Sequence, residues 1–430
     1  PEIAISHRVL KELSDLKSKL KDLEIKLDEK RYFIPIEKQD NVEQSNYDYL
    51  SRFDFFLNCK NNINPWKPDG NTTNYDLNKY NDVAPNSTHE IRITRAIIIF
   101  FPIQKMSKFQ HELKWLYRSW INMQTYEPKK WRTDLIIFLD TNNSAYKNPD
   151  IFLNDLNCKL DNKRKSLEDK PMCSLISYKT LATHQLKEFY SLLNANLLDY
   201  KYLDSILMAF EGYSYFKLAG YDYLIRSDMD TFLTPMFATW LPVHCNDFVV
   251  GGGGYSSEFN RKRFRRIAQN LGLNYPDVGD LGSTWYSTPD QFRLVSYLTL
   301  FGMGYLANEE FSEPERNGEV GTILWPDWHY GVLLLYGQNI ALNHLIGSKQ
   351  LSIVKLKKLI DYPTTNTQSI FNILHLHVYH GKDMFSKFIY SLEGYDNLTI
   401  EQNDPNASQV KYYALRMALE SKRLSLRDLN

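Results

Sequence analysis

The feature that most constrains this chain is an apolar run that ends in two carboxylates. Residues 221–226 have the composition of a buried β-strand, Asp228 and Asp230 follow directly, and Pro235 stops the segment. In an open α/β sheet, ligands bind beyond the carboxyl ends of the strands, where paired carboxylates are useful. Two oxygen ligands suit Mg²⁺ or Mn²⁺, which proteins bind together with substrate phosphates. The segment therefore predicts a metal–diphosphate site.

The composition is that of a globular protein without a polyanionic partner. With 430 residues, of which 43% are hydrophobic, the chain can bury a large core. Its 51 Lys and Arg residues balance its 51 Asp and Glu residues. The balance leaves no electrostatic case for binding nucleic acid or an anionic membrane surface.

Strands and helices alternate around the carboxylate segment. Short β-branched runs at 92–101 and 134–140 predict buried parallel strands, with a helix at 109–120 between them. A third strand is expected at 173–178, and a helix at 206–217 leads into the carboxylate strand. This alternation predicts an α/β fold with a doubly wound, mostly parallel sheet.

The N-terminal region has a different pattern. In the first thirty residues, apolar side chains recur at heptad spacing on a charged background: Val9, Leu13, Leu16, Leu20, Leu23 and Leu27. This seam fits either a helix packed on its own domain or a coiled-coil stem that pairs two chains as a homodimer. Residues 31–90 lack a sustained period and predict an irregular extension. We therefore expect a stem at 1–30, this extension, a catalytic domain at 91–390 and a helical tail at 391–430.

The order of strand, helix, strand and then a helix leading into Tyr-Leu-Ile-Arg-Ser-Asp228-Met-Asp230 resembles the GT-A superfamily of nucleotide-sugar glycosyltransferases. The resemblance covers about residues 91–390 and implies a Rossmann-like GT-A fold. It also implies a divalent metal, usually Mn²⁺, that bridges the donor diphosphate. Asp230 would be a direct ligand, and Asp228 would contact the donor ribose or a metal-bound water. The implied substrates are a nucleotide diphosphate sugar, expected to be UDP-linked, and a hydroxyl of a glycan or glycoprotein.

A second cluster, of three histidines, lies near the end of the regular region. An apolar segment carries His375, His377 and His380 and is followed by a glycine. Because the glycine ends the predicted strand, the imidazoles are expected at the end of another strand. GT-A enzymes similarly supply a late His as the third protein ligand of the metal, and a Lys that neutralises the leaving diphosphate. The resemblance implies His377, then His380, as the metal ligand, and Lys382 or Lys387 as the diphosphate contact. The spacing departs from the common His-x-x-Gly-x-x-Lys, so the choice of His stays open.

Aromatic and glycine-rich segments between these motifs are candidates for substrate contacts. Phe100 and Phe101, at the end of the first strand, either stack on the donor base or are buried sheet residues. The run 251–254 consists of four glycines and is either a sugar-facing turn or a plain flexible turn. Other aromatics beside hydrogen-bonding groups are either acceptor contacts or core residues: Tyr255, Trp285, Trp325 and Trp328.

Asp327 is the candidate catalytic base. It precedes an apolar, helix-like run at 330–336, so we expect it at a helix N-terminus, where a carboxylate is held ionised. GT-A enzymes similarly place an acidic residue near the start of a late helix, facing the acceptor. In an inverting reaction Asp327 would deprotonate the acceptor hydroxyl, and in a retaining reaction it would position the acceptor. A simple helix cap is the alternative.

Several features together favour a secretory location. The four cysteines allow up to two disulfides or four buried thiols: Cys59, Cys158, Cys173 and Cys245. Acceptor triplets for N-glycosylation begin at Asn71, Asn86, Asn142, Asn397 and Asn406. No window has the length of apolar sequence that a membrane span needs. With the stem and the start at Pro1, these features predict the Golgi-lumenal part of a type II membrane protein whose anchor precedes this sequence.

Two other functions stay open. Asp228-Met-Asp230-Thr-Phe-Leu also resembles the first motif of haloacid-dehalogenase-type phosphatases, in which the first Asp is a nucleophile and the second a general acid. That motif prefers Thr or Val where Phe232 stands, and it normally opens its domain. The third hypothesis is a catalytically silent lectin-like or scaffolding relative, against which the intact Asp228, Asp230 and His377 argue.

Overall fold

The computed structural model describes much of the chain from residue 92 onward. The described residues are 92–139, 155–160, 170–177, 195–198, 200–242, 247–319, 327–379, 385–398, 400 and 404–429. The expected stem and extension therefore lie outside the described residues. Among the described helices, none combines the length and the apolar character that a membrane span requires.

An eight-stranded sheet forms the centre of the structure, in the order β3-β4-β2-β1-β5-β8-β7-β9. The strands are β1 (Ile93–Phe101), β2 (Trp131–Leu139), β3 (Cys158–Leu160), β4 (Cys173–Ser177), β5 (Tyr223–Arg226), β7 (Asp247–Val250), β8 (Trp285–Ser287) and β9 (Ser352–Lys355). The first five in this spatial order run parallel, β8 is antiparallel to both of its neighbours, and β7 is parallel to β9. The prediction of an α/β fold with a mostly parallel sheet is confirmed, and the reversal at β8 was not expected.

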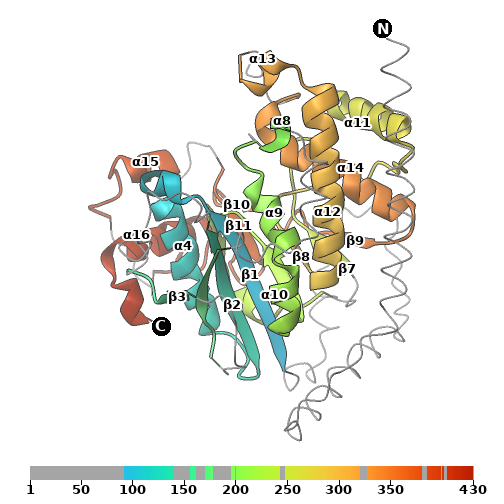
Figure 1. Ribbon diagram of the computed structural model, residues 1–430. Helices are drawn as coiled ribbons and strands as arrows, with labels where there is room; N and C mark the ends of the chain where they lie inside the picture. The colour runs from blue at the N-terminus through green and yellow to red at the C-terminus, as the bar shows by residue number, and fades with distance from the viewer. Residues whose placement is uncertain are drawn as a thin grey trace, which may run out of the picture.

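The central strands send alternate side chains into two separate cores. In β1, Ile97 and Ile99 belong to one core and Ile98 to the other. The first core contains residues of α4 (Met106–Gln124) and α16 (Val410–Arg423), and the second contains residues of α9 (Asp204–Glu211), α12 (Pro289–Tyr305) and α14 (Leu333–Gly347). Figure 1 shows α4 and α16 on one side of the strands and α9 and α12 on the other. Because both faces are covered, residues 96–101 of β1 and 135–139 of β2 are continuously apolar, as the sequence indicated, while Arg95, Arg132 and Asp134 are buried polar residues at the starts of these strands.

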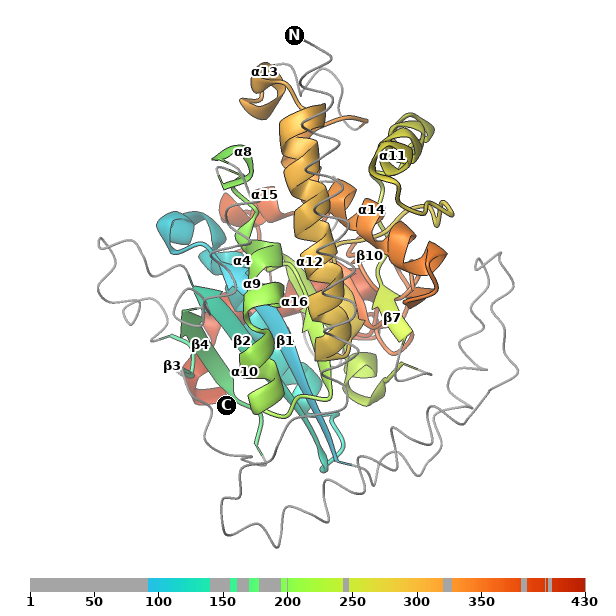
Figure 2. The same ribbon diagram turned by 45° about the vertical axis from the view of Figure 1, so that its right-hand side comes forward.

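The structure describes several further helical segments. They are α8 (Ala195–Leu198), α10 (Tyr213–Leu218), α11 (Glu258–Leu271), α13 (Glu313–Arg316), α15 (Lys387–Ser391), the 3₁₀ turns η2 (Ile103–Lys105), η3 (Pro235–Thr239), η6 (Tyr330–Val332) and η7 (Leu426–Leu429), and the π-helical turn η4 (Leu306–Glu310). The helix expected at 206–217 is two helices, α9 and α10, which Gly212 separates. Figure 2 shows both in front of β1. The segment 391–430, expected as a tail, supplies α16, whose Tyr413 and Met417 are buried in the first core.

The carboxylates follow β5 at the point where the strand order reverses. From β1 the chain continues to β2 and β4 on one side of the sheet, whereas β5 pairs with the other side of β1. Ile98 of β1 is in register with Arg226 of β5, and the Ser227 N–H donates to the Ile98 carbonyl at 3.2 Å. Open α/β sheets bind ligands at the carboxyl ends of the strands beside such a switch point. The pair Asp228 and Asp230 lies at this position.

A second, three-stranded sheet connects the carboxylate segment to the histidine segment. Its order is β10-β11-β6, with β6 (Thr231–Leu233), β10 (Tyr362–Pro363) and β11 (His375–His377). β11 is antiparallel to β6 and places His377 opposite Thr231. The Val378 N–H also donates to the Asp230 carbonyl at 3.0 Å. Backbone pairing therefore brings the two motifs together, although they are far apart in the sequence.

A disulfide joins Cys158 of β3 to Cys173 of β4, with their Cα atoms 4.5 Å apart. It attaches the short edge strand β3 covalently to the sheet. Of the pairings that the sequence left open, this one is present in the structure. Cys59 and Cys245 lie outside the described residues.

The disulfide allows a test of the fold. Replacing both cysteines, as C158S/C173S, should lower the free energy of unfolding by about 3 kcal/mol, the amount expected for a closed loop of about 15 residues. Urea unfolding monitored by circular dichroism measures the change. Adding a reductant to the unmodified protein should lower its free energy of unfolding by at least the same amount. If the double variant unfolded like the unmodified protein, the pairing would contribute nothing to the fold.

Candidate metal centre

Three side chains from the two motifs converge beyond β5. One carboxylate oxygen of Asp228, one of Asp230 and one ring nitrogen of His377 all lie within 4.8 Å of one another. All three residues are partly exposed, so a ligand can reach them. Carboxylates suit Mg²⁺ and Mn²⁺, and imidazole suits the transition metals, so this donor set fits a divalent ion such as Mn²⁺. The structure therefore brings together three residues that the sequence analysis named as metal-site candidates, and their role as ligands stays a prediction.

Asp230 lies between two basic side chains. Its Oδ1 is 3.4 Å from His377 Nε2, and its Oδ2 accepts a hydrogen bond from Lys387 Nζ at 2.9 Å. Burial alone raises the pKa of Asp230, but the charges of His377 and Lys387 outweigh burial and hold this pKa below its usual range. Asp230 is therefore ionised, which is the state of a carboxylate that binds a metal.

Asp228 is oriented by a buried arginine and a serine. Its Oδ2 accepts from Ser283 Oγ at 2.7 Å, and its Oδ1 is 3.6 Å from Arg226 Nη2. Arg226 is completely buried, donates to the carbonyls of Ser205 and Ser283, and lies over the Trp285 ring at 5.4 Å. The last residue of β5 therefore holds the carboxylate that follows it.

Glu112 of α4 is a member of the site that the sequence analysis missed. Its Oε1 is 3.7 Å from Lys387 Nζ, on the same ammonium group that contacts Asp230. Burial and the nearby Asp230 raise the pKa of Glu112 to about 7, against the opposing effect of Lys387. The one available signal was its position four residues before the buried Leu116, on the inward face of the helix. Glutamate is so common in helices that this position alone predicts nothing about function.

Three aromatic residues that we expected to contact substrates are core residues. Phe101 is 1% exposed, and Trp285 and Trp328 are 0% exposed. The expectations that Phe101 stacks on the donor base and that the two tryptophans contact the acceptor are corrected, because buried rings cannot reach a ligand. Trp285 instead supports Arg226, and Trp328 stacks on Tyr336 with the ring centroids 5.0 Å apart.

Two other aromatics keep some exposure. Phe100 packs partly buried against the second core, and Tyr255 is also partly buried. Tyr255 contributes to the raised pKa of Tyr379, a residue that stacks on His377, so Tyr255 belongs to the surroundings of the cluster. Their roles as donor-base and acceptor contacts stay predictions. His380, Lys382 and Trp325 lie outside the described residues.

Asp327 is not the helix cap that the sequence suggested. His329 caps η6, because its Nδ1 accepts from the Gly331 N–H at 2.9 Å, and α14 begins only at Leu333. The carbonyl of Asp327 accepts from the Tyr336 hydroxyl at 2.9 Å. The expected position at a helix N-terminus is corrected, while its role as a base stays a prediction.

The first three glycines of the run at 251–254 pack closely against neighbouring atoms. A Cβ atom on Gly251 would collide with the Asp361 carboxylate, and one on Gly253 would collide with the Leu281 carbonyl. The Gly251 N–H donates to the Thr284 carbonyl at 3.0 Å. Of the four glycines, Gly254 alone has open space around it. Close neighbours therefore explain why the first three positions have no side chain, and a sugar-facing role for the turn stays a prediction.

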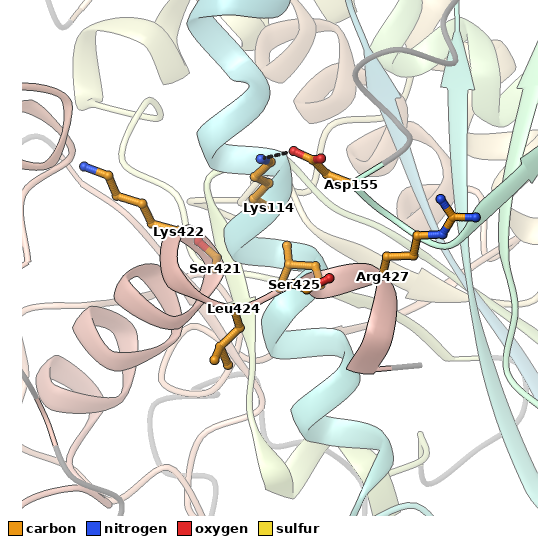
Figure 3. Close-up of a pocket in the computed structure, with 8 residues that line it drawn as sticks. Lys114, Asp155, Ser421, Lys422, Leu424, Ser425 and Arg427 are labelled. Carbon is orange, nitrogen blue, oxygen red and sulfur yellow. Dashed lines mark hydrogen bonds and ion pairs between the residues drawn. The ribbon is translucent and has the colours of Figure 1, made fainter.

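A separate pocket lies between α4 and the C-terminal end of α16 (Figure 3). It is lined by Lys114, Asp155, Ser421, Lys422, Leu424, Ser425, Leu426 and Arg427. Lys114 pairs with Asp155 at 2.7 Å, and Lys422 pairs with Asp396 at 2.6 Å. Because acidic partners already neutralise both lysines, this pocket offers no free positive charge from them to a ligand. We therefore take the carboxylate cluster as the candidate functional site.

The fold and the site together define an α/β protein with a carboxylate–histidine centre at the switch point of its sheet. Residues 89–430 match the family described as "Domain of unknown function (DUF7164)". The chain belongs to this family. No curated protein matches the sequence.

Two solved structures with some likeness to this chain are of glycosyltransferases. Mouse xyloside xylosyltransferase 1, in its apo form, has 10% sequence identity and a TM-score of 0.34, and the match covers 64% of this chain and 87% of that one. The bifunctional glycosyltransferase WbbM, also apo, has 10% identity and a TM-score of 0.34, with 68% of this chain and 46% of that one covered. The chain thus spans about half the length of WbbM. At these TM-scores the likeness decides neither fold nor activity.

The buried Arg226 leads to a prediction about the stability of the protein. Arg226→Lys should lower the free energy of unfolding by about 2 kcal/mol, because an ammonium cannot replace the hydrogen bonds of the guanidinium to Ser205 and Ser283. Arg261→Lys is the matched control, since its pair with Asp277 at 2.8 Å involves a side chain that is 36% exposed. The control should lose less than about 1 kcal/mol in the same urea titration. Equal losses would contradict an anchoring role for Arg226.

Proposed function

We propose that this protein is a metal-dependent glycosyltransferase of the GT-A type. It would move a sugar from a nucleotide diphosphate sugar, with UDP as the proposed nucleotide, to a hydroxyl of a glycan or glycoprotein. The observation that carries the proposal is the convergence of Asp228, Asp230 and His377 at the switch point of the sheet. Mn²⁺ is the proposed ion, with Mg²⁺ as the alternative.

The residues around the cluster fit the charge changes of this reaction. The acceptor oxygen bonds to the anomeric carbon, and the departing diphosphate takes the electron pair of the broken bond. A bound divalent ion would neutralise negative charge on that diphosphate. Lys387, 2.9 Å from Asp230, adds a second positive charge beside it, and Ser283 keeps Asp228 oriented. The acceptor proton needs a base, for which Asp327 remains the candidate in an inverting reaction.

The geometry favours this proposal over a phosphatase of the haloacid dehalogenase type. In that chemistry the second carboxylate must be protonated to act as a general acid. Asp230 has a lowered pKa between His377 and Lys387, so it would be in the wrong protonation state. The motif also follows β5, the fifth strand among the described residues, rather than opening the domain.

We further propose that the protein works in the secretory pathway, in the Golgi lumen, as part of a type II membrane protein. The Cys158–Cys173 disulfide supports an oxidising compartment. Among the N-glycosylation triplets, Asn397 is exposed and accessible to modification. Pairing of two chains through the stem at 1–30 belongs to the same proposal.

An activity assay tests the function directly. Incubation with Mn²⁺ and a panel of nucleotide sugars should release free nucleotide from UDP-sugars, and a chelator should stop the release. Release of phosphate from small phosphoesters would instead identify a phosphatase. Silence in both assays would favour a lectin-like or scaffolding protein.

A variant tests the site assignment. Asp230→Asn keeps the shape of the side chain but removes one ligand charge, so Mn²⁺-dependent UDP binding should weaken at least tenfold, about 1.4 kcal/mol. Calorimetric titration with and without Mn²⁺ measures it. Asp290→Asn, at a side chain that is 60% exposed on α12, is the control and should bind normally. Unchanged affinity in Asp230→Asn would remove this residue from the site.

Variants of His375 and His377 test which of the two histidines binds the metal. His377→Ala should weaken Mn²⁺ binding, because this ring faces Asp230 at 3.4 Å. His375→Ala should not, because the His375 Nε2 contacts Ser227 Oγ at 2.9 Å instead of the cluster. The reverse result would mean that β11 presents its other face to the metal.

A further inference from the structure

Asp361 is a buried carboxylate directly behind His377. Its Oδ1 is 3.6 Å from His377 Nδ1, and the side chain is shielded from solvent. On the opposite side of the ring, His377 Nε2 is 3.4 Å from Asp230 Oδ1. The imidazole therefore lies between two carboxylates, one in the metal cluster and one in the core.

The position of Asp361 is set from several directions. The Thr284 N–H donates to Oδ2 at 3.1 Å, and the Thr284 hydroxyl donates to Oδ1 at 2.5 Å. The Asp361 carbonyl accepts from the hydroxyl of Tyr379, whose ring stacks on His377. Asp361 also has φ of 54°, in the left-handed region that non-glycine residues seldom occupy. Such backbone conformations persist where the surrounding structure imposes them, often at functional sites.

Two glycines leave the space that this carboxylate fills. A Cβ atom on either Gly251 or Gly282 would collide with an Asp361 carboxylate oxygen. The Gly282 N–H donates to the Gly251 carbonyl at 2.9 Å, so the two segments are joined at this point. The backbone thus closes around one carboxylate, and a longer acidic side chain would not fit.

His375 is also near Asp361 but has a different role. Its Nδ1 accepts from the Asp361 backbone N–H at 3.4 Å, and its Nε2 contacts Ser227 Oγ. Its Nδ1 is also 3.5 Å from Asp361 Oδ1, so the carboxylate contacts both histidines of β11. His377 is the ring whose other nitrogen faces Asp230, at 3.4 Å, so Asp361 acts on the cluster through His377.

We propose that Asp361 is the positioning residue of the metal centre. Its negative charge keeps a proton on His377 Nδ1, so that Nε2, on the side of Asp230, would offer its lone pair to an ion held at the cluster. This inference rests on the metal site of the proposed function. Histidines that bind metals almost always direct their other ring nitrogen at a carboxylate, carbonyl or water, which sets the tautomer and raises the basicity of the ligand.

Asp361→Asn tests the proposal. Asparagine tolerates a positive φ and has the size of aspartate, so it removes the charge with little change in shape. The affinity for Mn²⁺ alone, measured by electron paramagnetic resonance without nucleotide, should fall about 10- to 100-fold. Thr284→Val is the matched control, because it removes a hydrogen bond to Asp361 and leaves the charge. Thr284→Val should lower the free energy of unfolding but change the Mn²⁺ affinity by less than about threefold. That change is small beside the loss expected when the carboxylate partner of a metal-binding histidine is removed.

A second measurement needs no variant. In the unmodified protein loaded with diamagnetic Zn²⁺, ¹⁵N NMR of the histidine rings should show His377 bound through Nε2 with a proton on Nδ1. Binding through Nδ1 would overturn the inference even if Asp361→Asn did not fold.

The outcomes separate the inference from the function on which it rests. If the unmodified protein bound no Mn²⁺, the metal site and the inference would fail together. If it bound Mn²⁺ and Asp361→Asn bound it equally well, or lost no more affinity than Thr284→Val, the inference alone would be overturned and the proposed function would stand.

Discussion

The concentration of negative charge at the end of β5 is the constraint on which the site depends. Asp228 and Asp230 are two residues apart and would repel each other if no positive charge were near. Arg226 lies against the first, while His377 and Lys387 lie against the second. These basic groups come from β5, β11 and α15, so the carboxylates are balanced only when these parts of the domain are assembled. In the proposed function, the same cluster would hold a divalent ion.

The core on one face of the sheet supports the segment that carries the carboxylates. The Tyr413 hydroxyl of α16 donates to the Leu233 carbonyl of β6 at 2.7 Å, and the Leu233 N–H donates to Ser119 Oγ of α4 at 3.0 Å. The strand after Asp230 is thus attached to two helices from opposite ends of the described chain. This explains in physical terms why the C-terminal helix belongs to the same unit as the sheet.

The local sequence was sufficient to predict structure where the residue types within a short segment identify the structure of that same segment. The β-branched runs of β1 and β2 were recognisable because a strand covered on both faces contains a near-continuous apolar run, here 96–101 and 135–139. The pair Asp228 and Asp230 was recognisable because ionisable residues directly after such a run are unusual. Aromatic residues gave no such distinction: Trp285 and Trp328 look the same in sequence whether they bind a sugar or fill a core, and here they fill the core.

The sequence by itself therefore determined the α/β class, the positions of β1, β2, β4 and β5, and the two motifs, since these depend on periodicity and residue type along a few neighbouring positions. Tertiary structure alone decided which groups meet. Asp361 and Glu112 reach the site only because β10 and β11 pair beside β6 and because α4 packs against β6. Their contacts join residues far apart in the chain, and a charge acts over a few ångströms of space rather than over a spacing in the sequence.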